Sequence, residues 1–415
     1  MDSGRAGYGQ PMDSTPTQSF GLLVIGSGPA GLHAAAAYVE AGGPGPVGIV
    51  SADPDRPYQR PPLSKAVLAG EEPCEATPIL EDDAVLERID VRLGTRVKTL
   101  DTDRQRVRTD DGQELAYERL VLATGSDPTP LPGADAEAAV FALRSLEHGR
   151  RLVEAVDKAG EAVVVGSGFI GCEAAASLAG RGVRTTLVTP EDAPQAARLG
   201  EWAGKRIAEW LTAAGVELRT GVQVEQVEAP CTVHLDDGSE LEADLVLAAV
   251  GVDQSRDFLE ESGLRIEGGR LVVDEELRTS EEHVWAAGDV ARAHHAVAGR
   301  ALMVEHWGDA IAMGQLVGAN AAASGPGGTG DPDTWSDAPG FWSEIGKHTL
   351  KYSAWGDGFE DLRVVEHGDG AFTVWYADAA GELVGVLTHE ANDDYERGGD
   401  LLARRAPLSE ALGEG

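Results

Sequence analysis

Cysteine is scarce in this chain of 415 residues, and long apolar runs are missing. The three cysteines, Cys74, Cys172 and Cys231, form no Cys-x-x-Cys pair and have no metal-ligand spacing, which argues against a disulfide framework and against a zinc site. No stretch reaches the roughly 18 apolar residues of a membrane-spanning helix. The opening segment 1–19 is polar and lacks the apolar centre of a signal peptide. We therefore expect no membrane insertion, no secretion and a cytoplasmic location.

Basic residues are also few: 34 Lys and Arg stand against 70 Asp and Glu, so the formal net charge is −36. Such a charge repels the phosphates of nucleic acids and of anionic membranes, and we expect neither as a partner. The hydrophobic fraction of 42% is ordinary for a globular protein, and the length allows two or three domains with cores of their own.

Glycine, by contrast, is plentiful, and two runs share the pattern Gly-x-Gly-x-x-Gly: residues 26–31 (GSGPAG) and residues 166–171 (GSGFIG). Each run follows a predicted apolar strand and precedes a predicted alanine-rich helix: strand 22–25 with helix 33–40, and strand 162–165 with helix 173–179. The first glycine of this pattern makes a tight turn, the second lets a pyrophosphate approach the backbone, and the third packs helix against strand. The helix N-terminus then faces the phosphates. Two copies in this context predict two bound dinucleotides.

The fold that these patterns predict is α/β, with two Rossmann-like dinucleotide-binding domains followed by a C-terminal α+β domain. The two nucleotide-binding halves repeat one plan, because each ends in an apolar strand followed by glycine, at 120–125 and 243–251. We predict the following boundaries: a disordered tail at 1–19, the first domain at 20–140 and 269–330, the second domain at 141–268, and the C-terminal domain at 331–415.

Beyond the second half, a short apolar strand at 284–287 indicates that the chain returns to the first domain, and a helix follows at 309–323. Alternating apolar residues predict an antiparallel sheet with a closing helix: strands 362–365, 372–376 and 383–387, and helix 400–405.

An acidic residue, Asp53, ends the second strand of the first half, where a carboxylate can accept hydrogen bonds from an adenosine ribose. The alternative is a turn residue that opens the loop before Pro54. The position of Asp53 alone does not distinguish these two interpretations, but the fingerprint upstream favours the ribose-binding role.

The segment 57–65 (PYQRPPLSK) is too distinctive for a generic turn. With it, the chain resembles the ferredoxin reductase branch of the two-dinucleotide flavoproteins, which includes putidaredoxin-reductase-like and biphenyl-dioxygenase-reductase-like enzymes and the apoptosis-inducing factor. The resemblance runs from Leu22 to the C-terminus through further motifs: Ala123-Thr124-Gly125, the second fingerprint with Glu173, Ala286-Ala287-Gly288-Asp289-Val290, Val304-Glu305-His306-Trp307 and Phe341-Trp342-Ser343.

This resemblance implies FAD in the first domain, NADH or NADPH in the second, and a C-terminal interface domain against the flavin. Asp53 would hold the FAD ribose and Asp289 the ribityl or phosphate groups. The implied FAD-binding residues are Gly26, Gly28, Pro29, Ala30, Gly31, Asp53, Arg60, Lys65, Ala123, Thr124, Gly125, Gly288, Asp289, Glu305, His306 and Trp307. The implied NAD(P)H-binding residues are Gly166, Gly168, Phe169, Ile170, Gly171, Glu173, Glu191 and Gly251. No metal is implied.

Four residues are implied to act in catalysis: Lys65, Glu173, Trp307 and Trp342. Lys65 and Glu173 would pair beside the hydride-accepting nitrogen of the flavin, where the lysine favours electron density and the carboxylate keeps it charged and aimed. Trp307 opens a helix whose N-terminal end can stabilise a reduced, anionic flavin. Trp342 would lie close to the flavin or nicotinamide. Unrelated surface positions for the first pair, and core packing for the tryptophans, are the alternatives.

The first domain lacks one feature of the disulfide reductases in the same superfamily. These enzymes carry a redox-active cysteine pair after the second strand, where this chain has Arg60-Pro61-Pro62. Neither Cys74 nor Cys172 has an evident activating neighbour, so we do not expect dithiol chemistry.

The chain also departs from its resemblance at two further points. In the second domain, strand 185–188 ends in Thr189, where NADH-using relatives usually carry an acid that binds the ribose. Glu191 or Asp192 can take that place; no arginine cluster follows, which favours NADH, although Arg198 leaves NADPH open. Asp127 stands where many relatives have a basic residue.

These observations predict an FAD-dependent NAD(P)H oxidoreductase that passes electrons to a ferredoxin-type iron–sulfur protein of a monooxygenase or dioxygenase system. A flavin suits this task because the nucleotide gives electrons in pairs and a cluster takes them singly. One alternative is an NAD(P)H oxidase, or a quinone or small-metabolite reductase, which the negative charge favours because ferredoxins are generally acidic. The other is a redox-responsive binding protein like the apoptosis-inducing factor. Both a monomer and a homodimer are compatible with the sequence.

Overall fold

The computed structural model describes residues 17–80, 83–254, 256–324, 331–356 and 358–413. Most of the predicted disordered tail lies outside these ranges. Its end belongs to strand β1 (Gln18–Phe20), which pairs in parallel with β7 (Glu114–Tyr117), so this strand begins inside the predicted tail.

The first nucleotide-binding unit is built on a five-stranded parallel sheet in the order β21-β8-β2-β3-β4. Its strands are β2 (Leu22–Ile25), β3 (Val47–Val50), β4 (Ile89–Arg92), β8 (Leu120–Leu122) and β21 (Val284–Ala286). Strand β21 comes from the returning segment and pairs with β8, which confirms the predicted return of the chain. Strands β2, β3, β8 and β21 are continuously apolar because they are buried on both faces of the sheet.

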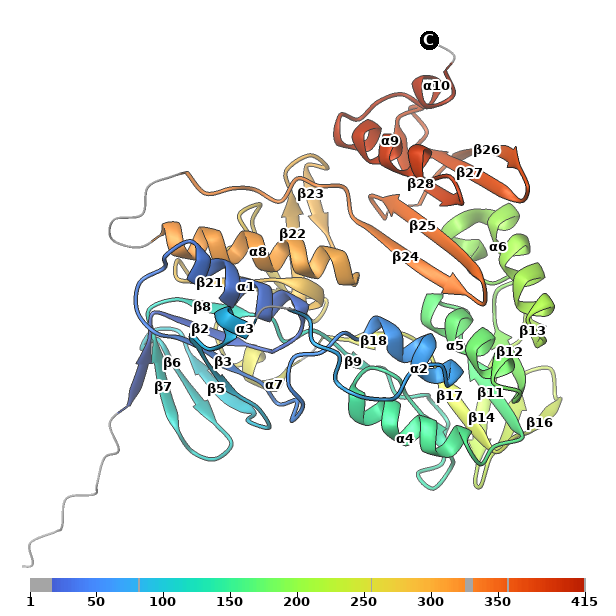
Figure 1. The fold of residues 1–415 in the computed structure, drawn as a ribbon, viewed down its shortest axis with the longest axis horizontal. Coiled ribbons are helices and arrows are strands. Elements are labelled where there is room, and N and C mark those ends of the chain that lie inside the picture. Colours follow the sequence, from blue (N-terminus) through green and yellow to red (C-terminus); the bar gives the residue numbers. More distant parts are fainter. Residues whose placement is uncertain (1–16, 81–82, 255, 325–330, 357, 414–415) are drawn as a thin grey trace, which may run out of the picture.

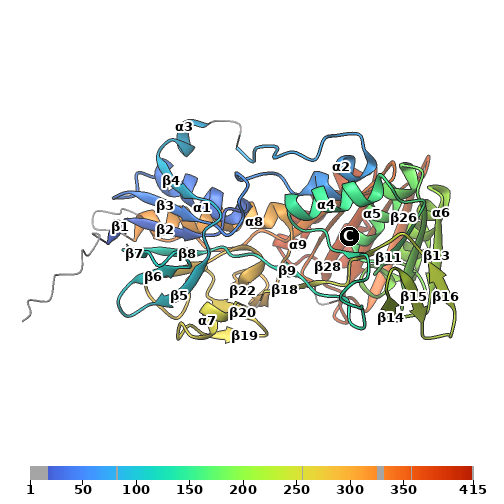
Figure 2. The same cartoon turned by 90° about the horizontal axis from the view of Figure 1, so that it is seen from below.

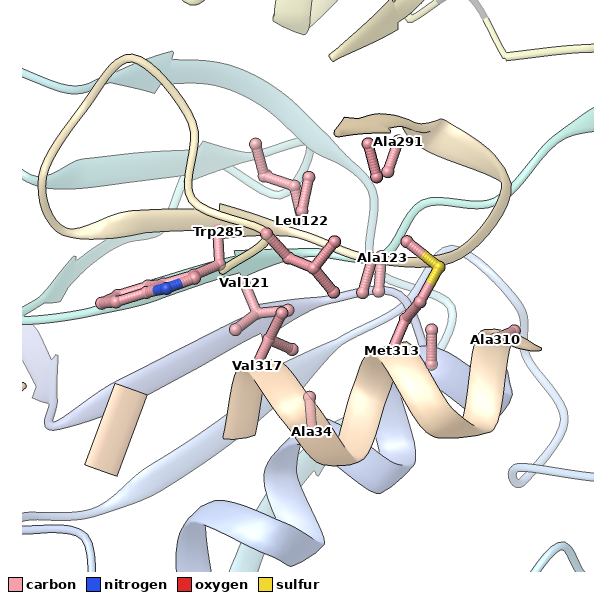
Figure 3. Close-up of a cluster of buried hydrophobic side chains, with 14 of the residues drawn as sticks. Ala34, Val121, Leu122, Ala123, Trp285, Ala291, Ala310, Met313 and Val317 are labelled. Carbon is pink, nitrogen blue, oxygen red and sulfur yellow. The ribbon is translucent and has the colours of Figure 1, made fainter. Parts of the chain in front are cut away.

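Helices α1 (Pro29–Glu40) and α8 (Trp307–Ala323) lie side by side along this sheet (Figure 1). Small residues allow their close approach: a Cβ at Gly314 would come 2.3 Å from the carbonyl oxygen of Ala30, and one at Gly318 equally close to that of Ala34. Figure 3 shows Met313 and Val317 of α8 facing the buried side chains of β8 and β21. This packing fixes the N-terminal end of α8 relative to the first fingerprint.

The second unit repeats the plan with a parallel sheet in the order β10-β17-β11-β12-β13. Its strands are β10 (Val140–Phe141), β11 (Glu161–Val165), β12 (Arg184–Thr189), β13 (Val216–Thr220) and β17 (Leu245–Ala248). Its helices are α4 (Leu146–Val156), α5 (Phe169–Gly180) and α6 (Ala196–Ala213). The predicted fingerprint strands and helices of both halves are thus confirmed in type, and each helix begins a few residues before its predicted start.

Two short strands join the units: β9 (Asp127–Pro128) leads into the second unit and pairs antiparallel with β18 (Val252–Asp253), which leads out of it. The boundaries predicted at 140/141 and 268/269 both lie C-terminal to this crossing. Just after it, α7 (Asp257–Glu260) packs against β5 (Val97–Asp101) of the first unit.

Smaller sheets flank the two parallel ones. One contains β1, β7, β6 (Arg106–Thr109) and β5, and a second contains β14 (Val224–Glu228), β15 (Thr232–Leu235) and β16 (Glu240–Glu242). A third contains β19 (Ile266–Glu267), β20 (Arg270–Val273), β22 (Ala291–His295) and β23 (Arg300–Leu302). Short helical turns complete these units: 3-10 helices at Pro61–Ser64 and Gly288–Val290, α2 (Ala66–Ala69) and α3 (Asp83–Leu86).

The C-terminal unit is an antiparallel sheet in the order β24-β25-β28-β27-β26. Its strands are β24 (Gly340–Ile345), β25 (His348–Ala354), β26 (Asp361–Gly368), β27 (Ala371–Ala377) and β28 (Leu383–His389). The helix predicted at 400–405 is longer and starts earlier, as α9 (Asn392–Ala403), and α10 (Leu408–Ala411) follows it. Figures 1 and 2 show this sheet (red) beside α5 and α6 of the second unit.

Within the described part of the chain, no helix is both long enough and apolar enough to cross a bilayer.

Candidate active site

The first fingerprint, residues 26–31, has the backbone geometry that the Gly-x-Gly-x-x-Gly pattern predicts. Gly26 has φ +112°, and a Cβ there would lie 2.1 Å from the carbonyl oxygen of Ala123 on the neighbouring strand. A Cβ at Gly31 would lie 2.0 Å from the carbonyl oxygen of Gly26, so this glycine lets α1 approach β2. A Cβ at Gly28, in contrast, would meet nothing within 4 Å. The open space at the second glycine is where a phosphate would approach the helix N-terminus.

The second fingerprint reproduces this geometry. Gly166 has φ +102° and lies against the carbonyl oxygen of Ala249, and a Cβ at Gly171 would lie 2.0 Å from the carbonyl oxygen of Gly166. Gly168 again faces open space. The two halves therefore present equivalent anion-binding turns at the N-termini of α1 and α5.

Both turns open into one cavity of about 1500 Å³, which also receives β24 of the C-terminal unit. This volume exceeds the range of about 300–1,000 Å³ that holds a single drug-sized ligand. All of the sequence-predicted site residues line the cavity except Gly31 and Gly166, which instead lie in the close backbone contacts just described.

The polar groups around the first fingerprint fit a dinucleotide. Among the described residues, Thr124 Oγ1 of the first unit and His148 Nδ1 of α4 in the second unit are buried cavity-lining atoms without a hydrogen-bond partner. Buried polar groups are normally paired, so these two atoms are available to a ligand. Together with the open turn at Gly28, they fit FAD in the place that the sequence predicts.

Asp53 is held at the edge of this half by its neighbours. Tyr58 donates a hydrogen bond to Asp53 Oδ2 at 2.9 Å, and Arg60 lies 3.9 Å from the same oxygen. The Tyr58 hydroxyl also accepts from the Leu146 backbone N–H at 2.8 Å. Burial, the largest cause, raises the pKa of Tyr58 to about 12, so it remains a donor at neutral pH.

Several guanidinium groups lie on the cavity wall, and most of them were not predicted from the sequence. Arg144 pairs with Asp289 at 2.5 Å, and Ser126 donates to the same carboxylate at 2.6 Å. Arg270 donates to the Asp289 carbonyl oxygen, and Arg256 lies 3.4 Å from the carboxylate of Asp127. Position 127 itself is acidic, but a basic group, Arg256, lies beside it. No local pattern marks these arginines, because each meets its partner only through contacts between segments that are distant in sequence.

Arg60 shows how strongly this wall is charged. Burial is the main cause of a lowered pKa for its guanidinium, and the neighbouring Arg144 adds to it. Two guanidinium groups close together in a cleft form a favourable site for an anion such as a pyrophosphate.

The predicted pair of Lys65 and Glu173 is present at the junction of the two halves. Lys65 Nζ lies 2.8 Å from Glu173 Oε2 and donates a further bond to the Pro61 carbonyl oxygen at 3.2 Å. Both side chains line the cavity, and Glu173 is buried. The alternative of two unrelated surface residues is therefore excluded, while their role toward a flavin stays a prediction.

Aromatic residues surround the cavity mouth. Trp307 is the first residue of α8, as predicted, and His306 is its N-cap. Phe341 of β24 contacts the rings of Phe169 and His306 at centroid distances of 4.4 and 4.5 Å. Trp342 is 41% exposed, so its side chain is not part of a packed core.

In the second half, the strand tip is occupied by a buried hydroxyl pair. Thr189 Oγ1 lies 2.8 Å from Ser167 Oγ, which leaves Glu191 and Arg198 as the charged cavity-lining groups beyond β12. The Glu191 carboxylate accepts a hydrogen bond from the Ala197 backbone N–H at 2.8 Å.

The cysteines have no activated thiol. Burial raises the pKa of Cys74, Cys172 and Cys231, the last to about 11. Across the described ranges, no group of three or more His, Cys, Asp or Glu side chains is arranged to hold a metal ion.

Comparison with known proteins agrees with this geometry. Residues 20–314 match the family model of pyridine nucleotide-disulphide oxidoreductases. The chain is similar to putidaredoxin reductase from Pseudomonas putida, at 30% identity over 94% of this chain and 93% of that protein. It is also similar to rubredoxin-NAD(+) reductase from Pseudomonas putida, at 30% identity over 77% of this chain and 84% of that protein.

Among solved structures, the covalent putidaredoxin reductase–putidaredoxin complex superposes with a TM-score of 0.86 at 28% identity, covering 94% of each chain. The predicted α/β fold with two dinucleotide-binding halves is therefore confirmed. This chain belongs to the pyridine nucleotide-disulphide oxidoreductase family.

Proposed function

We propose that this protein is an FAD-dependent oxidoreductase that accepts hydride from NADH and passes electrons to a small iron–sulfur protein. The observation that carries this proposal is the single cavity into which both fingerprint turns open, with Lys65 and Glu173 at their junction. Two dinucleotides seated on these turns would meet where the ion pair lies. Family membership and the names of the similar reductases support the same reading.

The first half would hold FAD. Its pyrophosphate would lie on the N-terminus of α1 at Gly28, with Arg60 and Arg144 as counter-charges and Thr124 as a hydrogen-bonding group. Asp53 would accept from the ribose. When bound, FAD supplies the conversion of a hydride into single electrons.

The second half would hold NADH. Gly168 leaves room for its pyrophosphate at the N-terminus of α5, and Glu191 would accept hydrogen bonds from the adenosine ribose. The same carboxylate would repel a 2′-phosphate, which supports NADH over NADPH, whereas Arg198 alone supplies a cation nearby.

Lys65 and the first turn of α8 would contribute electrostatics. The Lys65 ammonium, held by Glu173, keeps a positive charge in a partly water-excluded junction. The backbone N–H groups at Trp307 add the positive end of a 17-residue helix. Both features favour the arrival of negative charge in the cavity.

Trp342 and β24 would form part of the face where the electron acceptor arrives. Putidaredoxin reductase and rubredoxin-NAD(+) reductase are named for such acceptors, and a solved complex joins putidaredoxin reductase to putidaredoxin. We propose the corresponding class of partner, a small iron–sulfur protein, for this chain.

The test is turnover with defined acceptors. Purified protein and NADH are mixed with a [2Fe–2S] ferredoxin, with a rubredoxin, or with a soluble quinone, and acceptor reduction is followed by absorbance. Reduction of an iron–sulfur protein at a rate well above that of the quinone supports the proposal. Rapid reduction of quinone with none of either iron–sulfur protein would move the function to a quinone or small-metabolite reductase.

We also propose a cytoplasmic location, supported by the NADH requirement of the reaction and by unactivated, unpaired cysteines among the described residues. Fractionation of the native host, with the protein followed by antibody, checks this directly.

A further inference from the structure

The carboxylate of Glu173 is shared between parts of the chain that are far apart in sequence. Its Oε2 atom accepts from Ser64 Oγ at 2.6 Å and pairs with Lys65 Nζ at 2.8 Å, both in the segment that precedes α2. Its Oε1 atom accepts from Ser343 Oγ at 2.8 Å and from the Glu344 backbone N–H at 3.2 Å, both on β24 of the C-terminal unit. Each carboxylate oxygen thus accepts hydrogen bonds from a different segment of the chain.

This arrangement leaves the carboxylate no freedom to turn. Glu173 is only 4% exposed, and Ser343 is fully buried, so the contact between Ser343 Oγ and Oε1 is shielded from bulk water. A charged oxygen that loses a buried donor is left partly unsatisfied, and the side chain relieves this by rotating or by drawing in its remaining donors. Among these donors, Lys65 has the longest side chain and the most rotatable bonds.

Strand β24 is well fixed against α5 and can act as an anchor. Phe341, two residues before Ser343, packs edge-on against Phe169 at the start of α5. Ser343 then reaches Glu173, one helical turn further along α5. The two contacts define the register of β24 on α5.

We propose that Ser343 is a positioning residue for hydride transfer: it fixes the Glu173 carboxylate from the C-terminal unit and thereby aims the Lys65 ammonium into the cavity. This inference rests on the proposed function, because the aim of Lys65 matters only where a nucleotide gives up hydride. Ser343 itself touches neither dinucleotide site in the described geometry; it acts through Glu173 and Lys65.

Ser343 is a cleaner probe than Ser64. Ser64 adjoins Lys65 in the same 3-10 turn, so its replacement disturbs the segment that carries the lysine. Ser343 lies 170 positions from Glu173 and can be changed without altering that segment. Ser353 on β25 gives a matched control, since it is also buried in this sheet but donates to the Pro339 carbonyl oxygen at 3.1 Å.

The first experiment is a double-mutant cycle on flavin reduction by NADH in an anaerobic stopped-flow instrument. We expect Ser343→Ala to slow reduction about 3- to 10-fold, the loss of a hydrogen bond to a charged group felt through one intermediary. Ser353→Ala should reduce at the wild-type rate. In a Lys65→Met background, Ser343→Ala should cause no further loss, because the side chain through which it acts is gone.

The second experiment measures how accessible the Lys65 ammonium is to a reagent, and it does not depend on catalysis. The FAD-loaded protein is treated with a limiting amount of acetic anhydride, and acetylation is measured by peptide mass spectrometry. We expect Lys65 to be labelled faster in Ser343→Ala than in the wild type, with Lys158, an exposed lysine distant from the site, as the internal reference.

The outcomes separate the two claims. A wild type that NADH reduces, together with a Ser343→Ala variant that matches it in rate and in Lys65 labelling, overturns the positioning role alone. A Ser343→Ala loss that persists in the Lys65→Met background overturns it as well, since the effect would then be merely structural. A wild type whose flavin NADH does not reduce removes the proposed function and the positioning role with it.

Discussion

Arg144 shows how a side chain that lies in no recognisable motif can still contribute to a binding site. It donates to Asp289 at 2.5 Å and stands beside Arg60, which in turn lies 3.9 Å from Asp53, so two guanidinium groups and two carboxylates share this part of the cavity wall. The guanidinium N–H groups that these carboxylates do not use can bind the phosphate oxygens of an anionic ligand.

We expect Arg144→Ala to weaken FAD binding about tenfold or more, because it removes a charged donor and frees Asp289 to face the phosphates. The measurement is titration of apoprotein with FAD, followed by quenching of flavin fluorescence. Arg150→Ala is the control: Arg150 pairs with Asp55 on the surface and does not line the cavity. An unchanged FAD affinity in Arg144→Ala would contradict the assignment.

Lys65 carries the prediction about hydride transfer. Replacing it by methionine keeps the length of the side chain but removes the ammonium, so FAD should remain bound while reduction by NADH slows about 10- to 100-fold. Stopped-flow absorbance measures the rate, and FAD content is measured on the same sample. Lys158→Met, in the exposed segment just after α4, should have no effect. If Lys65→Met reduces as fast as the wild type, Lys65 and its pairing with Glu173 have no part in the reaction.

At the scale of elements, the two fingerprint turns can be changed independently of each other by substitution. Gly28 has φ −70° and Gly168 has φ −60°, both in the extended region that any residue adopts, and a Cβ at either would meet nothing within 4 Å. Substitution at these positions therefore leaves the fold intact and fills only the space proposed for a pyrophosphate.

Matched valine variants test this separation. We expect Gly28→Val to lose FAD, and Gly168→Val to keep FAD but bind NAD(+) at least about tenfold more weakly. Absorbance at the flavin band and calorimetric titration with NAD(+) give the two readings. A Gly168→Val protein that loses FAD and retains its affinity for NAD(+) would reverse the assignment of the two halves.

A histidine pair lies where helix α6 meets the C-terminal sheet. Trp210 stacks on His348 at a centroid distance of 4.4 Å, and His348 Nδ1 lies 3.4 Å from His389 Nε2. Burial, followed by the neighbouring His389 and Lys347, lowers the pKa of His348 below its ordinary value of 6.5. The folded state thus takes up this proton less readily than the unfolded chain, so stability is lost as the pH falls below about 6.5.

We expect the unfolding temperature to fall between pH 7.5 and pH 5.5, and to fall by roughly 1–3 °C less in His348→Phe, which keeps a ring against Trp210 but cannot titrate. Thermal melts followed by tryptophan fluorescence measure this difference. An identical pH dependence in the variant and the wild type would show that protonation of His348 does not contribute to the loss of stability at low pH.

The sequence predicted those elements whose signal is local. Strand β2 and the start of α8 at Trp307 follow from apolar runs and motifs, and the fingerprint glycines have the conformations that their pattern requires. Helix α9 was predicted too short, because its first turns, Asn392–Arg397, are mostly polar and pack only partly against the sheet. Strand pairing across the crossing of β9 and β18 is a tertiary contact that no local pattern encodes.

The residues of the candidate site also fall into two groups, those with a local sequence signal and those brought in by tertiary contacts. Lys65 and Glu173 could be found because each lies in a distinctive motif, and the structure adds that they touch. Ser343 also lies in a quoted motif, but its contact with Glu173 arises only when the C-terminal unit packs on α5. Arg144 and Arg256 lie in no such motif, and their ion pairs join segments that are distant in sequence.

At the scale of the whole molecule, Figures 1 and 2 show how the two parallel sheets and the C-terminal sheet are arranged. One cavity is lined by residues from all three of these units. The chain as a whole has a net charge of −36, whereas the residues that line the cavity include as many Lys and Arg as Asp and Glu. The cavity is therefore less hostile to an anionic dinucleotide than the charge of the whole chain would suggest.

The most direct test of the account is the visible spectrum of the purified protein, recorded anaerobically before and after mixing with NADH and, separately, with NADPH. We predict a bound flavin that NADH bleaches rapidly and NADPH bleaches more slowly, because the proposed position of Glu191 beside the adenosine ribose would repel a 2′-phosphate. A protein without a flavin spectrum after reconstitution with FAD, or one whose flavin neither nucleotide reduces, would contradict the central claim that one cavity brings two dinucleotides together for hydride transfer.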